Sequence, residues 1–168
     1  MRIFLIGYMG CGKSTVAKKL ANKLGLKVVD LDAEIVNATG KSIPEIFMSK
    51  GESGFRQLEK SMLQKWFKTD GFVMATGGGT PCFFESMDEM SGVGTTIYLQ
   101  MTAKALVDRL SESKEERPIL KGLSKEKMLK KVSGQLAKRE KFYKKAMLTV
   151  NGVNLDIEEL IGSLDHSK

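Results

Sequence analysis

The stretch from residue 7 to residue 14 reads Gly7-Tyr8-Met9-Gly10-Cys11-Gly12-Lys13-Ser14. It is a complete phosphate-binding loop of the form G-x-x-x-x-G-K-[ST]. The apolar run 3–6 before it is typical of a buried strand, and apolar residues recur at helical spacing from Thr15 to Leu24 after it. Strand, loop and helix therefore follow one another in the order that such a loop requires.

The loop predicts a site for a nucleoside triphosphate. Backbone N–H groups of a glycine-rich turn and the positive end of the following helix form a cradle for an anion. We expect the ammonium group of Lys13 to reach the β- and γ-phosphate oxygens as a catalytic residue, and the Ser14 hydroxyl to coordinate Mg²⁺. The loop residues expected to bind ATP are Gly10, Cys11, Gly12, Lys13, Ser14 and Thr15.

The composition is that of an ordinary globular domain, with 168 residues, 42% of them hydrophobic and 28% charged. No apolar run approaches the roughly 20 residues of a membrane span, and a strand that starts near residue 2 leaves no room for a leader peptide. We therefore expect a cytoplasmic protein without membrane contact. Two cysteines, Cys11 and Cys82, are too few for a disulfide framework.

The net charge of +7 raises the alternative of nucleic-acid binding. Much of the positive excess lies between Lys114 and Lys145, where lysine and glutamate alternate along a helical pattern. Aromatic residues that could stack on bases are nearly absent there, so we expect a solvated helix face and no nucleic-acid partner. A small anionic substrate and ATP would also benefit from a positive field.

Strand-like runs alternate with helical segments along the chain. The runs are 3–6, 27–29, 72–75, 95–99 and 147–150. This alternation predicts an α/β fold, a three-layer sandwich in which a five-stranded parallel sheet is flanked by helices. We find no linker or internal repeat, and expect a single domain over 1–168 whose ligands bind beyond the carboxyl ends of the strands.

The helical region after residue 41 carries clear boundary signals. Ser42 is followed by Pro44 and Glu45, which predicts a short helix from Ser42 to about Lys50. Gly51 should end it, and a second helix is expected from about Glu52 to Thr69. Apolar residues at helical spacing in that second helix should lie in the core.

Asp30 and Asp32 follow the second strand-like run, and strand alternation would place both carboxylates on one side. One carboxylate can hold Mg²⁺ through water, while the other orients a substrate hydroxyl and accepts its proton. The alternative interpretation is an aspartate that caps a helix starting near Ala33.

A glycine triplet follows the third strand-like run, within Thr76-Gly77-Gly78-Gly79-Thr80-Pro81. Consecutive glycines expose backbone N–H groups and allow a ligand to approach closely. We therefore expect a binding role, with a long flexible loop as the alternative.

Three arginines are candidates for binding anions. Arg117 lies in a charged stretch between two helical segments, which suits a lid that brings an arginine onto the transferred phosphate. The alternative is a solvated loop. Arg56 and Arg139 could clamp one carboxylate from two helices, but their separation of more than eighty residues does not allow them to be paired from spacing.

The ordered series of motifs resembles the shikimate kinase family. Besides the phosphate-binding loop and Asp30-Leu31-Asp32, the matching stretches are 40–47, 51–59, 76–81, 117–120 and 139–146. Each motif is only moderately specific, but the series spans nearly the whole chain in the family's order.

The resemblance implies transfer of the γ-phosphoryl group of ATP to the 3-hydroxyl of shikimate, giving shikimate 3-phosphate and ADP on the route to chorismate and the aromatic amino acids. It implies a P-loop fold like that of nucleoside-monophosphate kinases. A substrate-binding segment, about 31–60, and a lid, about 111–123, would close over the reactants. We expect the enzyme to act as a monomer.

On the acceptor side, the resemblance implies that Asp32 holds and activates the hydroxyl, as a catalytic residue, and that Asp30 lies on the magnesium side with Ser14. Arg56 and Arg139 would grip the carboxylate of shikimate. The residues expected to line its ring are Gly77, Gly78 and Gly79.

On the nucleotide side, the resemblance implies that Arg117 is the catalytic lid arginine over the phosphates and that Arg109 flanks the adenine. The stretch 149–152 departs from the family pattern, because it offers no arginine or proline to stack on adenine.

Two other functions compete with this one. The first is another small-molecule or nucleotide kinase of the same fold. The second is a P-loop regulatory or nucleic-acid module, which would need a basic surface with stacking residues.

Overall fold

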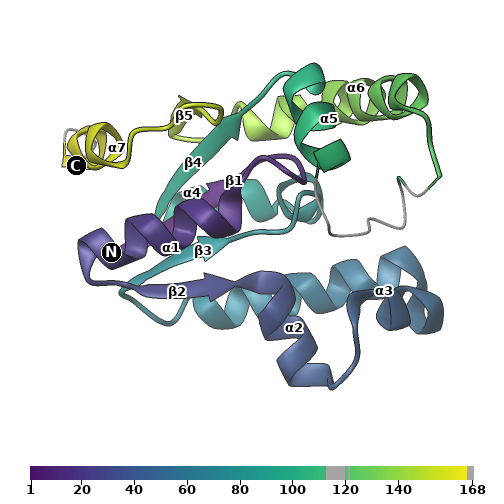
Figure 1. The fold of residues 1–168 in the computed structure, drawn as a ribbon. Coiled ribbons are helices and arrows are strands. Elements are labelled where there is room, and N and C mark those ends of the chain that lie inside the picture. Colours follow the sequence, from purple (N-terminus) through teal and green to yellow (C-terminus); the bar gives the residue numbers. More distant parts are fainter. Residues whose placement is uncertain (113–119, 121, 166–168) are drawn as a thin grey trace.

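The computed structural model describes residues 1–112, 120 and 122–165. Its centre is a five-stranded parallel sheet with the strand order β2-β3-β1-β4-β5 (Figure 1). The strands are β1 (Arg2–Ile6), β2 (Lys27–Asp30), β3 (Phe72–Ala75), β4 (Thr95–Gln100) and β5 (Leu148–Asn151). The predicted parallel α/β sandwich is confirmed, and each strand lies within one or two residues of its predicted run.

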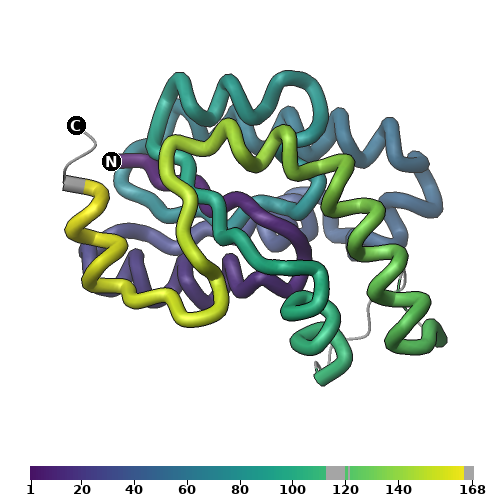
Figure 2. The backbone as a smooth tube through the Cα atoms, turned by 90° about the horizontal axis from the view of Figure 1, so that it is seen from above, coloured from purple at the N-terminus to yellow at the C-terminus, as the bar shows by residue number. Residues whose placement is uncertain are grey.

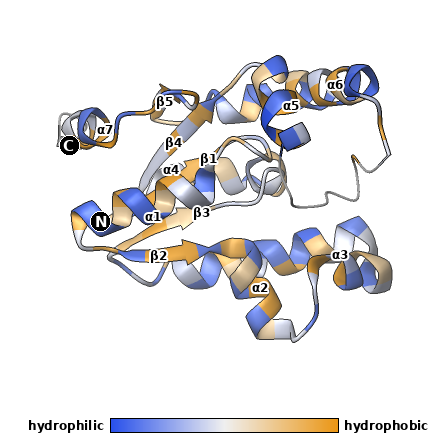
Figure 3. Cartoon of the chain, viewed as in Figure 1, coloured by the Kyte–Doolittle hydropathy of each residue, from blue (hydrophilic) through white to orange (hydrophobic). Residues whose placement is uncertain are grey.

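The hydropathy of the strands agrees with their central or edge position in the sheet. The central strands β1 and β3 have no alternating polar face, because helices cover both sides, and residues 3–6 and 72–74 are completely buried. Apart from Arg2 at the start of β1, these strands are apolar (Figure 3). The edge strands β2 and β5 contain exposed residues, among them Val28 at 39% exposure.

Helices cover the two faces of the sheet. They are α1 (Lys13–Leu24), α2 (Leu31–Thr39), α3 (Ile43–Trp66), α4 (Ser86–Val93), α5 (Ala103–Glu112), α6 (Lys125–Tyr143) and α7 (Ile157–Asp165). A short 3₁₀ helix, η1 (Thr80–Cys82), precedes α4. Figure 1 shows α1 in front of the sheet and α4 behind it, and Figure 2 shows α7 beside α1. None of the described helices combines the length and hydropathy needed to cross a bilayer.

Helix α3 contains the predicted break. Ser42 and Glu45 form a capping box, in which Glu45 accepts from the Ser42 N–H at 2.7 Å. Gly51 has a non-helical backbone, with φ 66° and ψ −178°, so it divides α3 into the two predicted parts. The second part ends at Trp66, somewhat before the expected Thr69.

The apolar stripe of α3 is buried as predicted, but two charged residues of this helix, Arg56 and Glu59, are buried with it. They lie on the side that faces η1 and the glycine triplet. Most of the predicted lid, including Arg117, lies outside the described residues.

Candidate active site

A pocket of about 270 Å³ lies at the carboxyl ends of β1, β2 and β3. Figure 1 shows these strand ends and the loops that follow them. Three segments far apart in the sequence meet there: the phosphate-binding loop, the aspartate pair and the glycine triplet. The lining residues are Met9, Gly10, Gly12, Lys13, Ser14, Thr15, Asp30, Asp32, Thr76, Gly77 and Gly78.

The phosphate-binding loop has a backbone that only glycine adopts readily. Gly7, Gly10 and Gly12 have φ of 148°, 81° and 94°. A Cβ on Gly10 would also lie 2.9 Å from Leu110 Cδ2. Because no side chain caps α1, the N–H groups of its first turn remain available to an anion in the pocket.

The cation of the loop, Lys13, is buried against the loop itself. Its Nζ donates to the carbonyls of Gly7 at 2.7 Å and Tyr8 at 3.0 Å. Cys11 does not line the pocket, because its side chain is 1% exposed and its N–H donates to the Tyr8 carbonyl at 3.3 Å. Arg109 reaches the loop from α5 and donates to the Cys11 carbonyl at 3.3 Å.

The aspartate pair reaches the pocket by a different route from the predicted one. Strand β2 ends at Asp30, and Asp32 lies in the first turn of α2, so the expected strand alternation is wrong. Asp30 is the N-cap of α2 and accepts from the Ala33 N–H at 3.3 Å through one carboxylate oxygen. Its other oxygen accepts from the Ser14 hydroxyl at 2.9 Å. Asp30 therefore caps α2 and contacts the phosphate-binding loop at the same time, through its two carboxylate oxygens.

Asp32 is a carboxyl group tuned towards neutral pH. Burial raises its pKa to about 6, with the negative charges of Glu59 and Asp30 acting in the same direction. The positive charges of Lys13 and Arg56 oppose this rise. A carboxyl with this pKa is able to take a proton from an alcohol and release it near pH 7.

The glycine triplet is packed against charged side chains of the protein itself. A Cβ on Gly77 would lie 2.8 Å from Glu59 Oε1, and a Cβ on Gly79 would overlap Arg56 Nη2. At Gly78, a Cβ would lie 3.5 Å from Arg139 Nη1. Glycine is therefore required at 77 and 79 because larger residues would displace these charges.

Arg56 is held in place by Glu59, a residue to which the sequence analysis assigned no role. Arg56 Nη1 donates to Glu59 Oε2 at 2.7 Å, and the Thr80 hydroxyl donates to Glu59 Oε1 at 2.6 Å. Phe83 packs its ring 4.4 Å from the guanidinium carbon. The i,i+3 spacing of opposite charges on α3 was the available signal for this pair.

One N–H donor of Arg56 is available to a bound ligand. Its Nε is buried and has no hydrogen-bond partner among the described residues, and it lies 3.7 Å from Glu52 Oε1, beyond hydrogen-bond distance. A buried donor without a partner is costly unless a ligand supplies the acceptor.

Arg139 reaches the same place from α6. Its guanidinium carbon lies 5.5 Å from the centre of the Tyr8 ring, beside Gly78. Tyr143, one turn further along α6, donates to the Gly78 carbonyl at 2.5 Å. The two arginines that could not be paired from sequence therefore contact adjacent glycines.

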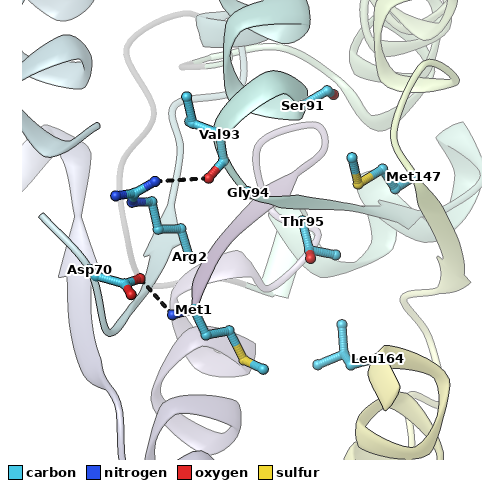
Figure 4. A pocket seen from close by; sticks show the side chains of 9 residues that line it. All are labelled: Met1, Arg2, Asp70, Ser91, Val93, Gly94, Thr95, Met147 and Leu164. Atoms are coloured by element: carbon cyan, nitrogen blue, oxygen red, sulfur yellow. Dashed lines mark hydrogen bonds and ion pairs between the residues drawn. The ribbon is translucent and has the colours of Figure 1, made fainter. Parts of the chain in front are cut away.

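A second cavity, of about 520 Å³, lies at the opposite, amino-terminal edge of the sheet (Figure 4). Its charged groups are already paired, since the Met1 ammonium contacts Asp70 at 2.5 Å and Arg2 donates to the Val93 carbonyl at 3.2 Å. None of the predicted site residues lines it. Volume alone therefore does not identify the candidate active site.

Comparison with known proteins shows the family to which the chain belongs. The family model for shikimate kinase matches residues 9–164. The shikimate kinase of Parabacteroides distasonis is 41% identical, over 98% of this chain and 92% of that protein. The chain belongs to the shikimate kinase family.

Solved shikimate kinases share the fold closely. The enzyme from Bacteroides thetaiotaomicron has a TM-score of 0.92 and 38% identity, covering 99% of this chain and 97% of that one. Shikimate kinase from Acinetobacter baumannii, solved in complex with shikimate, has a TM-score of 0.86 and 30% identity, covering 99% and 94%. A deoxyadenosine kinase from M. mycoides, with bound dATP, has a TM-score of 0.60 at 15% identity over 98% and 100%, which shows the common fold alone.

Membership of the shikimate kinase family settles the class of the enzyme. The protein is an ATP-dependent phosphotransferase with an alcohol acceptor, built on the P-loop fold of nucleoside-monophosphate kinases. The parallel sheet and the phosphate-binding loop at the carboxyl end of β1 agree with that class.

Proposed function

We propose that the site transfers the γ-phosphoryl group of ATP to the 3-hydroxyl of shikimate, which gives shikimate 3-phosphate and ADP. The product continues towards chorismate and the aromatic amino acids. One observation carries the proposal: Asp32, Arg56 and Arg139 converge on the glycine triplet next to the phosphate-binding loop. A carboxylate-bearing alcohol needs this combination of a base and two cations.

The nucleotide side consists of the loop and the start of α1. The γ-phosphate would draw the Lys13 ammonium away from the Gly7 and Tyr8 carbonyls, which it contacts at 2.7 and 3.0 Å. Lys13 would then neutralise the charge that develops on the transferred group. Arg109, already at the loop, is proposed to flank the adenine. Arg117 is proposed to cover the phosphates, although it lies outside the described residues.

The residues beside the loop fit a magnesium ion. Ser14 Oγ and Asp30 Oδ2 are 2.9 Å apart and both line the pocket. Mg²⁺ prefers oxygen ligands and keeps several waters, so Ser14 would hold it directly and Asp30 through water. When bound, the ion supplies positive charge to the β- and γ-phosphate oxygens.

The acceptor side consists of α2, α3, α6 and the glycine triplet. Arg139 and the Nε of Arg56, which has no hydrogen-bond partner among the described residues, would bind the carboxylate of shikimate, whose ring would lie along residues 77–79. Asp32 would orient the 3-hydroxyl and accept its proton, since a carboxyl with a pKa of about 6 is largely ionised at pH 7.

We further propose that the enzyme works as a cytoplasmic monomer and binds neither nucleic acid nor membrane. The segments about 31–60 and 111–123 would close over the substrates. The exposed face of α6 supports the proposal on nucleic acid: although most of its exposed residues are lysines, none of them is an aromatic residue that could stack on a base.

A coupled ADP-release assay tests the function. Shikimate, gluconate, AMP and single-stranded DNA are offered as acceptors or activators under identical conditions with ATP and Mg²⁺. We expect turnover with shikimate alone. Turnover that requires AMP or DNA would contradict the proposal.

A further inference from the structure

The side chain of Tyr8 contributes a contact that the phosphate-binding motif does not require. The motif allows any residue at this position of the loop. Tyr8 is nevertheless 1% exposed, and its side chain points away from the phosphate pocket and towards α6. A large aromatic residue buried at an unrestricted position calls for a physical reason.

Tyr8 is attached to α6 by two residues on one face of that helix. Its hydroxyl donates a hydrogen bond to Gln135 Oε1, and its ring lies 5.5 Å from the guanidinium carbon of Arg139. Gln135 and Arg139 are four residues apart, so they face the same direction. Tyr143 continues the row and donates to the Gly78 carbonyl at 2.5 Å. The row joins the phosphate-binding loop, Arg139 and the glycine triplet.

We propose that Tyr8 is a positioning residue for the acceptor carboxylate. Its ring supports one face of the Arg139 guanidinium and holds it beside Gly78, while Gln135 fixes the orientation of the ring. The inference rests on the proposed function, in which Arg139 binds the carboxylate of shikimate. Arg56 does not need such support, because Glu59 already fixes its guanidinium at 2.7 Å.

The contacts of Tyr8 predict a selective effect. The Tyr8 side chain does not line the phosphate pocket, and its substitution retains the backbone of the loop. The loop should therefore keep its grip on ATP when the ring is lost. Arg139 should lose its fixed orientation when the ring is absent. We therefore expect the affinity for the acceptor to fall while the affinity for ATP is unchanged.

The test measures KM for shikimate and for ATP, together with kcat, in Tyr8→Leu and Tyr8→Phe. A cation–π contact to a half-buried arginine is worth between the values for exposed and desolvated sites, which predicts that Tyr8→Leu raises KM for shikimate about tenfold. Tyr8→Phe retains the ring and should raise it only about threefold, through loss of the hydrogen bond to Gln135. Both variants should leave KM for ATP within about twofold of the parent value.

Tyr98→Phe is the matched control. Tyr98 is as buried as Tyr8, but its hydroxyl has no hydrogen-bond partner in the part of the chain that the structure describes. Removal of this hydroxyl should leave both KM values unchanged. Melting temperatures of all variants separate a change in affinity from a loss of folded protein.

The decisive measurement uses the Arg139→Ala background. If Tyr8 acts through Arg139, Tyr8→Leu adds nothing to the KM for shikimate once Arg139 is absent. An equal tenfold effect in both backgrounds, or a parallel rise in KM for ATP, would overturn the inference and leave the proposed function intact. A parent enzyme without shikimate-dependent turnover would overturn both.

Should Tyr8→Leu fail to fold, Tyr8→Phe and Gln135→Met decide the matter, because each removes only one side of the hydrogen bond. Both are expected to raise KM for shikimate about threefold without effect on KM for ATP. No change in KM for shikimate in either variant would overturn the inference, in which the bond to Gln135 fixes the ring that supports Arg139.

Discussion

The nucleotide half and the acceptor half of the active site are built in different ways. The nucleotide half is a continuous stretch, residues 7–15, which uses backbone N–H groups and one lysine. The acceptor half consists of single side chains from α2, α3 and α6, placed around the glycine triplet. The first depends on local backbone conformation, whereas the second depends on the packing of elements far apart in sequence.

This difference predicts that a substitution in the nucleotide half acts directly on phosphoryl transfer. One in the acceptor half should act through neighbouring charges, on acceptor affinity or on pH dependence.

Asp32→Asn should have the largest effect, because the base is at the junction of the two halves. Loss of a positioned general base predicts a fall in kcat of about 10³-fold, measured by ADP release. KM for ATP should change little. Retention of more than a tenth of the parent kcat would show that Asp32 only aligns the hydroxyl.

The same substitution should stabilise the folded protein at pH 8. The pKa of Asp32 is about 6 in the folded state, above its ordinary value, so the folded state binds this proton more tightly than the unfolded state does. The stability that comes from proton binding is full below about pH 4 and is lost as the pH rises through 6. Asparagine removes this loss, and the free energy of unfolding at pH 8 should rise by about 2 kcal/mol. Thermal unfolding at pH 4 and pH 8 measures it.

Lys13→Ala tests the nucleotide half. Loss of one positioned charge contact on the transferred phosphate is worth about 3 kcal/mol, which lowers kcat by about 10²-fold. The fold should survive, because the Lys13 hydrogen bonds given by the described residues stay within its own loop, to the Gly7 and Tyr8 carbonyls and to Cys11 Sγ. An unchanged kcat would remove Lys13 from the catalytic machinery.

Arg56→Lys tests the acceptor half. A lysine cannot reproduce both the bond to Glu59 and the free Nε of Arg56, so we expect KM for shikimate to rise by about 30-fold, with KM for ATP nearly unchanged. Steady-state kinetics with each substrate varied in turn measures both constants. An equal rise in KM for shikimate and KM for ATP would contradict the division of the site into a nucleotide half and an acceptor half.

Glu59→Gln should raise KM for shikimate less than Arg56→Lys does, because the amide oxygen of glutamine can still accept a hydrogen bond from Arg56. Its main effect should be on the pH dependence. The negative charge of Glu59 helps to raise the pKa of Asp32 to about 6, so its removal lowers that pKa. In the parent enzyme kcat/KM should fall as the pH drops through about 6, because Asp32 becomes protonated. In the variant this fall should begin at lower pH. A pH profile with an unshifted acid limb would show that Asp32 is not the group being titrated.

Local patterns were sufficient for the fold and for the nucleotide half. The strand-like runs, the break at Gly51 and the phosphate-binding loop were all found within a residue or two of their places, because each depends on neighbours in sequence. The acid pair was located correctly but for the wrong reason, since a helix begins at Leu31 where a strand was expected to continue.

For the acceptor half, the sequence predicted which residues take part but not how they are arranged in space. Nothing in the spacing of Arg56 and Arg139 shows that they meet at Gly79 and Gly78. The part played by Glu59 also depends on Thr80 and Gly77, which lie on another segment. Such contacts connect residues through the crossovers of the sheet, and sequence periodicity does not report them.

By itself, the sequence determined a P-loop, a parallel sheet and the residue types of the site, because hydrophobic periodicity and glycine dihedrals are local properties of the chain. Only the tertiary structure decided which charges share a pocket and why Asp32 has a pKa near neutrality. Burial and electrostatic coupling fall off over a few ångströms in space, and distances of that kind exist only after the strands and helices have packed.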